Sequence, residues 1–394
     1  MFLDEVLNRI SISEIVENAK RLIEIPSVTG EERDVMLYAQ DMMEDDGIAT
    51  RLYGSEERPI LTGTINPDAE RLLVFNGHLD TVPISDPNAW SMDPYKPEVK
   101  DNKLYGRGSC DMKASCGLMI HVMKLLKEMD LNLGIQVQLV PDEERGGGEG
   151  TQRLIEEINK GRIRRPDYVV IGEKSNLKIR IAERGIFQFE IKFDGRATHT
   201  AYARVEGINA IAKASKGVLA LEKPIDKYHE WIGAPVLSVN SIEAGTVPNQ
   251  VPSSCVIGVD RRLIIGESAD SVVSEVTAAL NEAGEGDPDW NWSIIAEKDQ
   301  EGNYLYSTPS YTAPDSVLGE ALHASVRKAL NSKPELFVEW AGGTDGRFYR
   351  YADIQTIGFG PKGEHAHGAD EFVYVDSLMD QARVYVALAH ELSR

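Results

Sequence analysis

The sequence predicts an α/β fold: a mostly parallel sheet flanked by helices, with an inserted α+β domain that contains an antiparallel sheet. Two observations lead to this prediction. Short apolar runs alternate with stretches of helical length in the first and last parts of the chain, a pattern typical of parallel sheets covered on both faces. Between these parts, from about residue 183, apolar and polar residues alternate strictly, which is typical of a half-exposed antiparallel strand.

The first part of the chain supplies the elements of the parallel sheet. Residues 12–24 have apolar side chains on one helical face, and the helix is expected to end there because Pro26 disfavours helix in the residue before it. In parallel sheets, ligand sites gather beyond the carboxyl ends of the strands. Buried strands are expected at 72–75, 134–140 and 168–171, and helices at 111–129 and 151–158.

The middle of the chain predicts a separate domain over 183–298, inserted into a catalytic domain formed by 1–182 and 299–394. Its first strand, 187–193, alternates Phe and Ile with polar residues. Its further strands are expected at 236–242 and 255–263, and its helices at 209–221 and 269–280. From Ser316 the pattern returns to long helices and short buried strands, with strands at 336–338 and 354–359 and a closing helix at 375–392.

Composition excludes several classes of function. A formal net charge of −21 over 394 residues repels phosphate backbones, so we expect no nucleic-acid partner. Three cysteines without a CxxC pair give no disulfide framework, which indicates a reducing compartment. No apolar stretch approaches the ~18–20 residues that span a bilayer, and the N-terminus lacks the pattern of a secretory signal. We therefore expect a cytoplasmic protein with no membrane partner.

Histidines and acids follow the expected strands and the loops between them. Imidazole together with several carboxylates and no thiolate suits a borderline-to-hard divalent metal. Four acids beside two histidine ligands are enough for two ions, and this indicates metal-assisted hydrolysis. The residues that form this pattern are His78, Asp80, Asp111, Glu143, Glu144, Glu173, His365 and His367.

Simple geometry gives some of these residues a role. His78 would coordinate one ion, and Asp80, two residues further along an extended segment, would hold the far imidazole nitrogen. Asp111 could bridge two ions, because a carboxylate has two oxygens. In an extended segment Glu143 and Glu144 would face opposite ways, so one would bind a metal and the other would act as general base.

The conjunction of motifs resembles the M20 metallopeptidase family, the group of acetylornithine deacetylase, succinyl-diaminopimelate desuccinylase, aminoacylase and carboxypeptidase G2. The resemblance covers nearly the whole chain in order. The motifs that carry it are Gly77–Pro83, Gly106–Lys113, Asp142–Glu144, Gly172–Glu173, Gly342–Arg347 and His367–Glu371.

This resemblance implies a complete set of metal ligands. His78 and Glu173 would bind one ion, Glu144 and His367 would bind the other, and Asp111 would bridge them. Zinc is the expected metal, and cobalt or manganese would suit the same ligands.

The resemblance also assigns the residues around the metals. Glu143 would be the general base and Asp80 would orient His78. The peptide bond Asp111–Met112 would be cis.

Two histidines compete for the last ligand position. In the family this histidine is followed, three and four residues later, by an acidic or amide residue and a Glu. His367 meets this condition through Asp370 and Glu371, whereas His365 does not. We expect the two acids themselves to be surface or supporting groups.

The inserted domain resembles the family's dimerisation lid, which implies a homodimer. His199 would reach the active site of the partner subunit and donate a hydrogen bond to the oxyanion of the tetrahedral intermediate. The resemblance further implies substrate contacts from Asn249, Arg262, Arg347, Gly343, Thr344 and Arg184.

We therefore expect a two-metal amidohydrolase that hydrolyses the amide bond of a small N-acyl amino acid, of the deacetylase or desuccinylase type. Glu at position 173 tends to accompany deacylases in the family. The alternative is a dipeptidase or carboxypeptidase with the same machinery. A nucleotide-binding oxidoreductase is disfavoured, because Gly106 and Gly108 do not belong to a GxGxxG turn between strand and helix.

Overall fold

The computed structural model describes residues 3–338 and 342–394 and divides into two compact units. The first unit comprises Met1–Ala182, Tyr311–Phe337 and Thr344–Arg394, and the second comprises Glu183–Ser310 and Val338–Gly343. Two of the crossings between the units lie within short paired strands, β8 (Ala182–Glu183) and β13 (Ser310–Tyr311), and the chain crosses again after Phe337 and after Gly343.

The second unit ends later than the expected boundary at residue 298. The segment that follows this boundary returns to pair with strand residues of the second unit. Ile186 and Ser307 exchange two backbone hydrogen bonds of 2.9 Å, and the amide of Leu305 donates to the carbonyl of Glu297. Pairing of the chain up to Ser310 therefore sets this limit.

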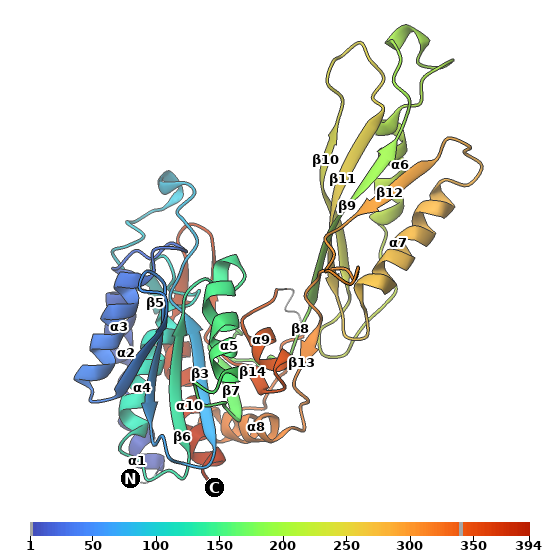
Figure 1. Ribbon diagram of the computed structural model, residues 1–394. Coiled ribbons are helices and arrows are strands. Elements are labelled where there is room, and N and C mark those ends of the chain that lie inside the picture. The colour runs from blue at the N-terminus through green and yellow to red at the C-terminus, as the bar shows by residue number, and fades with distance from the viewer. Residues whose placement is uncertain (1–2, 339–341) are drawn as a thin grey trace. The chain divides into compact units, whose positions relative to one another are not determined.

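A six-stranded mixed sheet forms the centre of the first unit, in the order β1-β2-β6-β3-β7-β14 (Figure 1). Strands β6, β3, β7 and β14 are mutually parallel, whereas β1 and β2 form an antiparallel edge. The expected α/β class with a mostly parallel sheet is confirmed. The strands are β1 (Ala49–Gly54), β2 (Pro59–Ile65), β3 (Leu72–His78), β6 (Gly134–Val140), β7 (Tyr168–Ile171) and β14 (Gln355–Gly358).

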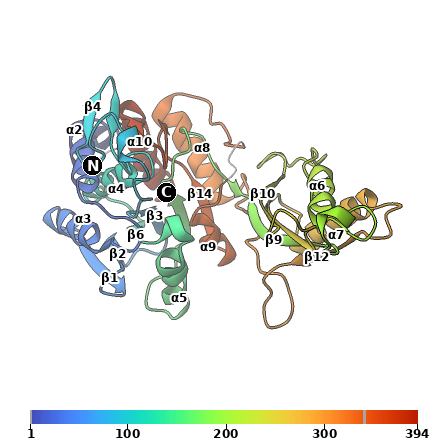
Figure 2. The same ribbon diagram turned by 90° about the horizontal axis from the view of Figure 1, so that it is seen from above.

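Helices cover both faces of this sheet (Figure 2). On one face, Phe75 of β3 stacks on Tyr385 of α10 with ring centroids 4.4 Å apart. On the other face, Leu154 of α5 and Tyr349 of α9 pack into a buried cluster with Val74. The helices of the unit are α1 (Leu3–Leu7), α2 (Ile12–Ile23), α3 (Arg33–Asp45), α4 (Lys113–Leu126), α5 (Arg153–Asn159), α8 (Val317–Leu330), α9 (Gly346–Tyr351) and α10 (Val375–Leu392).

Where bounds were predicted for this unit, most lie close to the observed ones, and no bounds were predicted for β1, β2, α1, α3, α8 and α9. Two predicted elements differ. The helix expected at 151–158 is preceded by an irregular turn, η3 (Gly148–Gln152), and α5 starts only at Arg153. The strand expected at 336–338 was wrong. Leu336 forms an isolated bridge with Ile179, through hydrogen bonds from Ile179 to Glu335 and from Phe337 to Ile179, and a single bridge is too little pairing for a strand.

A second, small sheet of the first unit was not expected from the sequence. Its order is β15-β16-β5-β4, all antiparallel. Its strands have only two or three residues each, which is too short for a visible alternation of apolar and polar residues. They are β4 (Glu98–Lys100), β5 (Lys103–Tyr105), β15 (Gly363–Glu364) and β16 (Phe372–Tyr374).

The second unit is an α+β sandwich of an antiparallel sheet, in the order β10-β11-β9-β12, and two helices. Phe187 and Phe193, on the buried face of β9, pack in one cluster with residues of both helices. This confirms the predicted antiparallel sheet. The elements are β9 (Gly185–Asp194), α6 (Ala210–Leu221), β10 (Val236–Ala244), β11 (Ser254–Leu263), α7 (Ala269–Ala283) and β12 (Asn291–Ile295).

Among the described residues, no helix combines the length and the apolar character needed to cross a lipid bilayer. The three cysteines, Cys110, Cys116 and Cys255, are buried free thiols.

Candidate metal centre

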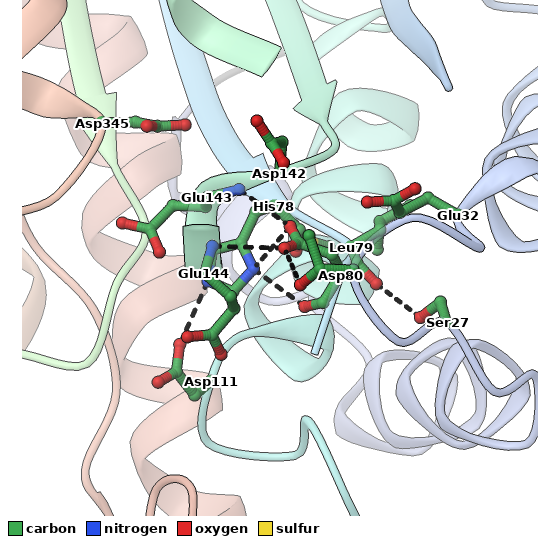
Figure 3. A network of polar contacts seen from close by, with 12 residues as sticks. Ser27, Glu32, His78, Leu79, Asp80, Asp111, Asp142, Glu143, Glu144 and Asp345 are labelled. Carbon is green, nitrogen blue, oxygen red and sulfur yellow. Dashed lines mark hydrogen bonds and ion pairs between the residues drawn. The ribbon is translucent and has the colours of Figure 1, made fainter. Parts of the chain in front are cut away.

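His78, the last residue of β3, is enclosed by acidic groups (Figure 3). Its Nε2 lies 3.1 Å from Oδ1 of Asp111 and 3.1 Å from Oε1 of Glu173. Its Nδ1 lies 3.0 Å from the backbone carbonyl of Asp80 and 3.5 Å from that residue's carboxylate. The far imidazole nitrogen thus meets Asp80, as expected, but its closer contact is with the carbonyl and not the carboxylate.

His367 faces the other side of the same bridging carboxylate. Its Nε2 lies 3.2 Å from Oδ2 of Asp111 and 2.9 Å from Oε2 of Glu144. The neighbouring His365 packs its ring edge-on against Phe372, with centroids 5.7 Å apart. Asp111 therefore offers one oxygen to each of two imidazoles, and His367 is the histidine that lies in this cluster.

The donor set fits a pair of divalent ions. Each Nε2 faces two carboxylate oxygens, although a single N–H has only one hydrogen to donate. Ligands about 2.0–2.1 Å from a tetrahedral zinc are about 3.3 Å apart, close to the four separations found here. Among the described residues, ligand atoms within 4.8 Å of one another also form two groups that share His78, one with Asp111 and Glu144 and the other with Glu143 and Glu173. Neither of these groups includes His367.

Electrostatics give the same indication. Burial and the nearby charge of Asp111 raise the pKa of Glu173 to about 7. Burial also raises the pKa of Glu143 well above its ordinary value, with Asp345 among the acids that add to the shift. Hydrogen bonds to Asp111 and Glu144 raise the pKa of His367 to about 10. So many acids in one place favour a bound cation or bound protons.

Glu143 and Glu144 follow β6 in a single 3₁₀ turn, η2 (Glu143–Arg145), and not in the extended segment that we expected. The turn begins at Asp142, whose φ of 71° is left-handed. Figure 3 shows the two side chains leaving this turn in different directions, with Glu144 directed toward Asp111. The two glutamate side chains therefore diverge because the backbone turns here, and not because the segment is extended.

Asp80 connects the two strand ends that bear these residues. Its carboxylate is fully buried and accepts hydrogen bonds from the backbone amides of Glu143, at 3.1 Å, and Glu144, at 3.2 Å. It also accepts a hydrogen bond of 2.8 Å from the hydroxyl of Thr29. Asp80 thus fixes both the imidazole of His78 and the glutamate turn.

Sequence reasoning missed a second set of supports behind this turn. Arg58 donates to Glu32, at 2.9 Å, and to Asp142, at 2.6 Å. Glu32 is fully buried and also accepts from the amide of Gly30. Arg58 lies between β1 and β2, where nothing in the sequence marks it as part of a site.

The Gly342–Arg347 motif contacts the loop after the glutamate turn. Asp345 is buried and accepts a hydrogen bond of 2.7 Å from the hydroxyl of Thr151, and it lies against Gly147. Arg347 donates to the carbonyl of Gly146 at 2.9 Å. The hydroxyl of Thr344 accepts from the amide of Gly346, in the first turn of α9. Thr344 and Arg347, expected to contact substrate, therefore have partners within the chain.

The remaining expected substrate residues lie in the second unit, as does Gly343. His199 and Asn249 are exposed on neighbouring segments, since His199 bridges with Gln250 and the carbonyl of Asn249 accepts from Thr200. Arg262 forms an ion pair of 2.7 Å with Asp260.

Arg184 is 9% exposed and donates to the carbonyl of Ile232. Burial and the charge of Arg262 lower its pKa.

The peptide bond between Asp111 and Met112 is cis, as the resemblance implied. Together, the fold and the ligand set define the class of this protein as a metal-dependent hydrolase.

The chain belongs to peptidase family M20/M25/M40, whose family model matches residues 74–391, and the resemblance seen in its motifs is confirmed. Among its relatives are two succinyl-diaminopimelate desuccinylases. The one from Cupriavidus pinatubonensis is 29% identical over 358 residues, covering 88% of each chain. The one from Polynucleobacter necessarius is 28% identical over 331 residues, covering 81% of each chain.

Solved structures show the same fold. Aminopeptidase PepT from Bacillus cereus superposes with a TM-score of 0.77 at 19% identity, covering 98% of this chain and 100% of that chain. Human carnosine dipeptidase 1 superposes with a TM-score of 0.75 at 16% identity, covering 100% of this chain and 99% of that chain.

Substitution of the two neighbouring histidines tests the ligand set. We expect metal-free wild type to bind two divalent ions per chain and His367→Ala to lose one of them, because the removed imidazole faces Asp111 and Glu144. His365→Ala is the matched control and should bind both ions. Calorimetric titration with Zn²⁺ measures both stoichiometries, and a loss in the His365→Ala variant would contradict the assignment.

Metal affinity should depend on pH. In the metal-free protein Glu173 and His367 have raised pKa values, of about 7 and about 10, so they hold protons that an incoming ion must displace. Apparent affinity should therefore rise as pH is raised from about 6 to about 8. Calorimetry at pH about 7 in buffers of different ionisation enthalpy should detect proton release on binding. An affinity that is constant with pH would show that metal binding does not displace protons from Glu173 and His367.

Proposed function

We propose that this protein is a two-metal amidohydrolase that hydrolyses the amide bond of an N-acyl amino acid. The observation that carries the proposal is the position of Asp111, whose two oxygens face His78 and His367 separately. In the proposed site, His78 and Glu173 hold one ion, Glu144 and His367 hold the other, and Asp111 is shared. Zinc is the metal we propose, and cobalt or manganese suit the same donors.

Ions bound at these residues would polarise the scissile carbonyl and make the attacking water more acidic. Glu143 then acts as general base: it takes a proton from that water and later delivers it to the leaving amine. Its raised pKa suits a group that must both accept and release a proton near neutral pH. Asp80 holds the amide of Glu143 and so keeps the base in place.

The acyl group that we propose carries its own carboxylate, as a succinyl group does. Relatives at 28–29% identity bear the name succinyl-diaminopimelate desuccinylase, which supports this class. A protein with a net charge of −21 needs a local cation to attract such a substrate. Arg184 is the favoured residue, because among the described residues its guanidinium donates only to the carbonyl of Ile232, whereas Arg262 is paired with Asp260.

His199 is the proposed donor to the oxyanion, supplied by a second copy of the chain. Its Nδ1 accepts a hydrogen bond from the amide of Ala201 at 3.2 Å, which leaves Nε2 free to carry the proton that a donor needs. Asn249, on the neighbouring segment, is proposed to contact substrate from the same copy.

A homodimer is proposed because the second unit has an uncovered edge. β10 ends the sheet, and it carries the exposed Ile242, while Leu219 of α6 is 74% exposed beside it. Both residues line one groove of about 500 Å³. An apolar edge strand readily pairs with a second copy.

Free buried thiols agree with the cytoplasmic location that we propose.

A substrate screen after metal reconstitution tests the proposal directly. We expect N-succinyl and N-acetyl amino acids to be hydrolysed with higher kcat/KM than dipeptides, and N-succinyl substrates to be preferred. A tenfold or greater preference for dipeptides would contradict the deacylase and favour the peptidase alternative of the same family.

The role of Glu143 is tested by Glu143→Ala. This variant should keep both metal ions yet lose about 10²–10⁴-fold in kcat, because the base is removed while the ligands remain. Glu149→Ala, in the same loop, is the control, since its carboxylate pairs with Arg153 on the surface. Turnover near the wild-type rate in Glu143→Ala would mean that another group is the base.

The dimer is tested by introducing charged residues at the apolar positions Ile242 and Leu219. Ile242→Lys and Leu219→Glu should each convert a dimer into a monomer in sedimentation velocity, because a buried unpaired charge opposes association. Ile295→Lys, at a 46% exposed position of the opposite edge strand β12, should remain dimeric. A monomeric wild type would contradict the proposal, as would dissociation caused equally by Ile295→Lys.

A further inference from the structure

A buried ion pair, Arg107 with Glu371, lies beside the metal centre without belonging to its ligand set. Arg107 is 2% exposed and Glu371 is fully buried, and Nη1 of the arginine is 2.6 Å from Oε2 of the glutamate. The two residues lie at the same end of the two central strands of the small sheet, Arg107 after β5 and Glu371 before β16. Burying such a pair is costly unless its remaining hydrogen-bonding capacity is satisfied.

Glu371 meets this condition through the loop that carries Asp111. Its Oε1 accepts from the amides of Cys110, at 2.9 Å, and Asp111, at 3.0 Å. Its Oε2 accepts from the amide of Gly108 at 3.0 Å, in addition to Arg107. Hydrogen bonds to an ionised acceptor are about twice as strong as neutral ones. One carboxylate therefore holds three backbone amides of the short segment that ends in Asp111.

The same ion pair reaches the loop that carries His367. Nη2 of Arg107 donates to the carbonyl of His367 at 3.3 Å, and the amide of Gly106 donates to the carbonyl of Glu371 at 3.0 Å. His367 has a φ of 63°, in the left-handed region, which a residue with a side chain adopts only where its surroundings hold it. Arg107 is one of the groups that hold it.

The ion pair thus connects two ligands that are distant in the sequence. Neither loop belongs to the large sheet that places His78 and Glu173. The separation between Oδ2 of Asp111 and Nε2 of His367 depends on how the two loops are held together. Arg107 and Glu371 contact the backbone of both loops and none of the proposed ligand atoms.

We propose that Glu371 and Arg107 are positioning residues that set the separation of Asp111 from His367, and so govern affinity for the ion held by Asp111, Glu144 and His367. This inference rests on the proposed two-metal function. The other ion shares Asp111, but its two further ligands, His78 and Glu173, lie at the ends of β3 and β7, so we expect it to be less affected.

Glu371→Gln tests the proposal with almost no change in shape. In either orientation of the glutamine, its NH₂ group faces backbone or guanidinium donors, so the hydrogen bonds that one carboxylate oxygen accepted are lost. Arg107→Lys keeps the charge but loses the fork that reaches both Glu371 and His367. Titration of the metal-free proteins with Co²⁺, followed by absorption and calorimetry, measures the two binding steps separately.

In Glu371→Gln we expect the affinity of one Co²⁺ binding step to fall by about 10–100-fold, as for other groups that support metal ligands. The affinity of the other binding step should stay within about twofold of wild type. Arg107→Lys should weaken the step that Glu371→Gln weakens. In a His367→Ala background, Glu371→Gln should have little further effect on the remaining ion. The ion pair of Arg107 and Glu371 is proposed to act on the ion that His367 binds, and the His367→Ala variant has already lost that ion. Leu388→Ala, at a fully buried position of α10, is the control for lost stability and should leave both steps unchanged.

Each outcome decides a different claim. If wild type binds two ions and Glu371→Gln binds both with unchanged constants, the positioning role is overturned and the proposed function stands. If both steps weaken equally in Glu371→Gln, the ion pair supports the unit in general and the inference again fails. If wild type binds fewer than two ions, the proposed function itself fails.

Discussion

Repulsion among closely packed carboxylates is the constraint on which this structure depends. Asp80, Asp111, Glu144 and Glu173 all approach His78 or its immediate neighbours, and Glu143 lies beside them. Desolvation and mutual repulsion make this arrangement unfavourable unless positive charge is supplied. A pair of divalent cations would supply it, and the same cations would give a hydrolase its electrophile. The same arrangement of ligands would therefore relieve the repulsion among the carboxylates and hold the ions that the hydrolysis needs.

Two kinds of support hold that arrangement. The parallel strands β3, β6 and β7 end at one edge of the large sheet, and they deliver His78, the glutamate turn and Glu173 to it. Asp111 and His367 come instead from loops next to the small sheet, and hydrogen bonds to Glu371 hold the loop of Asp111 where no long strand does. Strand ends thus position His78, the glutamate turn and Glu173, whereas a buried ion pair supports the loops that carry Asp111 and His367.

The large sheet and the proposed ligands could be predicted because they leave regular marks in the sequence. Buried strands are continuous apolar runs, and the carboxyl ends of parallel strands are where sites gather. The small sheet could not be predicted, since strands such as β15 are too short to show a period. Arg58 was missed as a support because no local pattern marks its contacts with Glu32, 26 residues away, and Asp142, 84 residues away. Glu371 was expected only as a surface or supporting group, and its contacts with the segment that ends at Asp111, 260–264 residues away, leave no mark in the sequence. The glutamate turn was taken as extended, since the left-handed Asp142 that bends it has no unique signal.

Anomalous diffraction from crystals grown with Zn²⁺ or Co²⁺ tests the central claim most directly. The account predicts two anomalous peaks about 3.5–4 Å apart, one beside His78 and Glu173 and one beside Glu144 and His367, with Asp111 between them. A single peak, or two peaks that do not share Asp111, would contradict it.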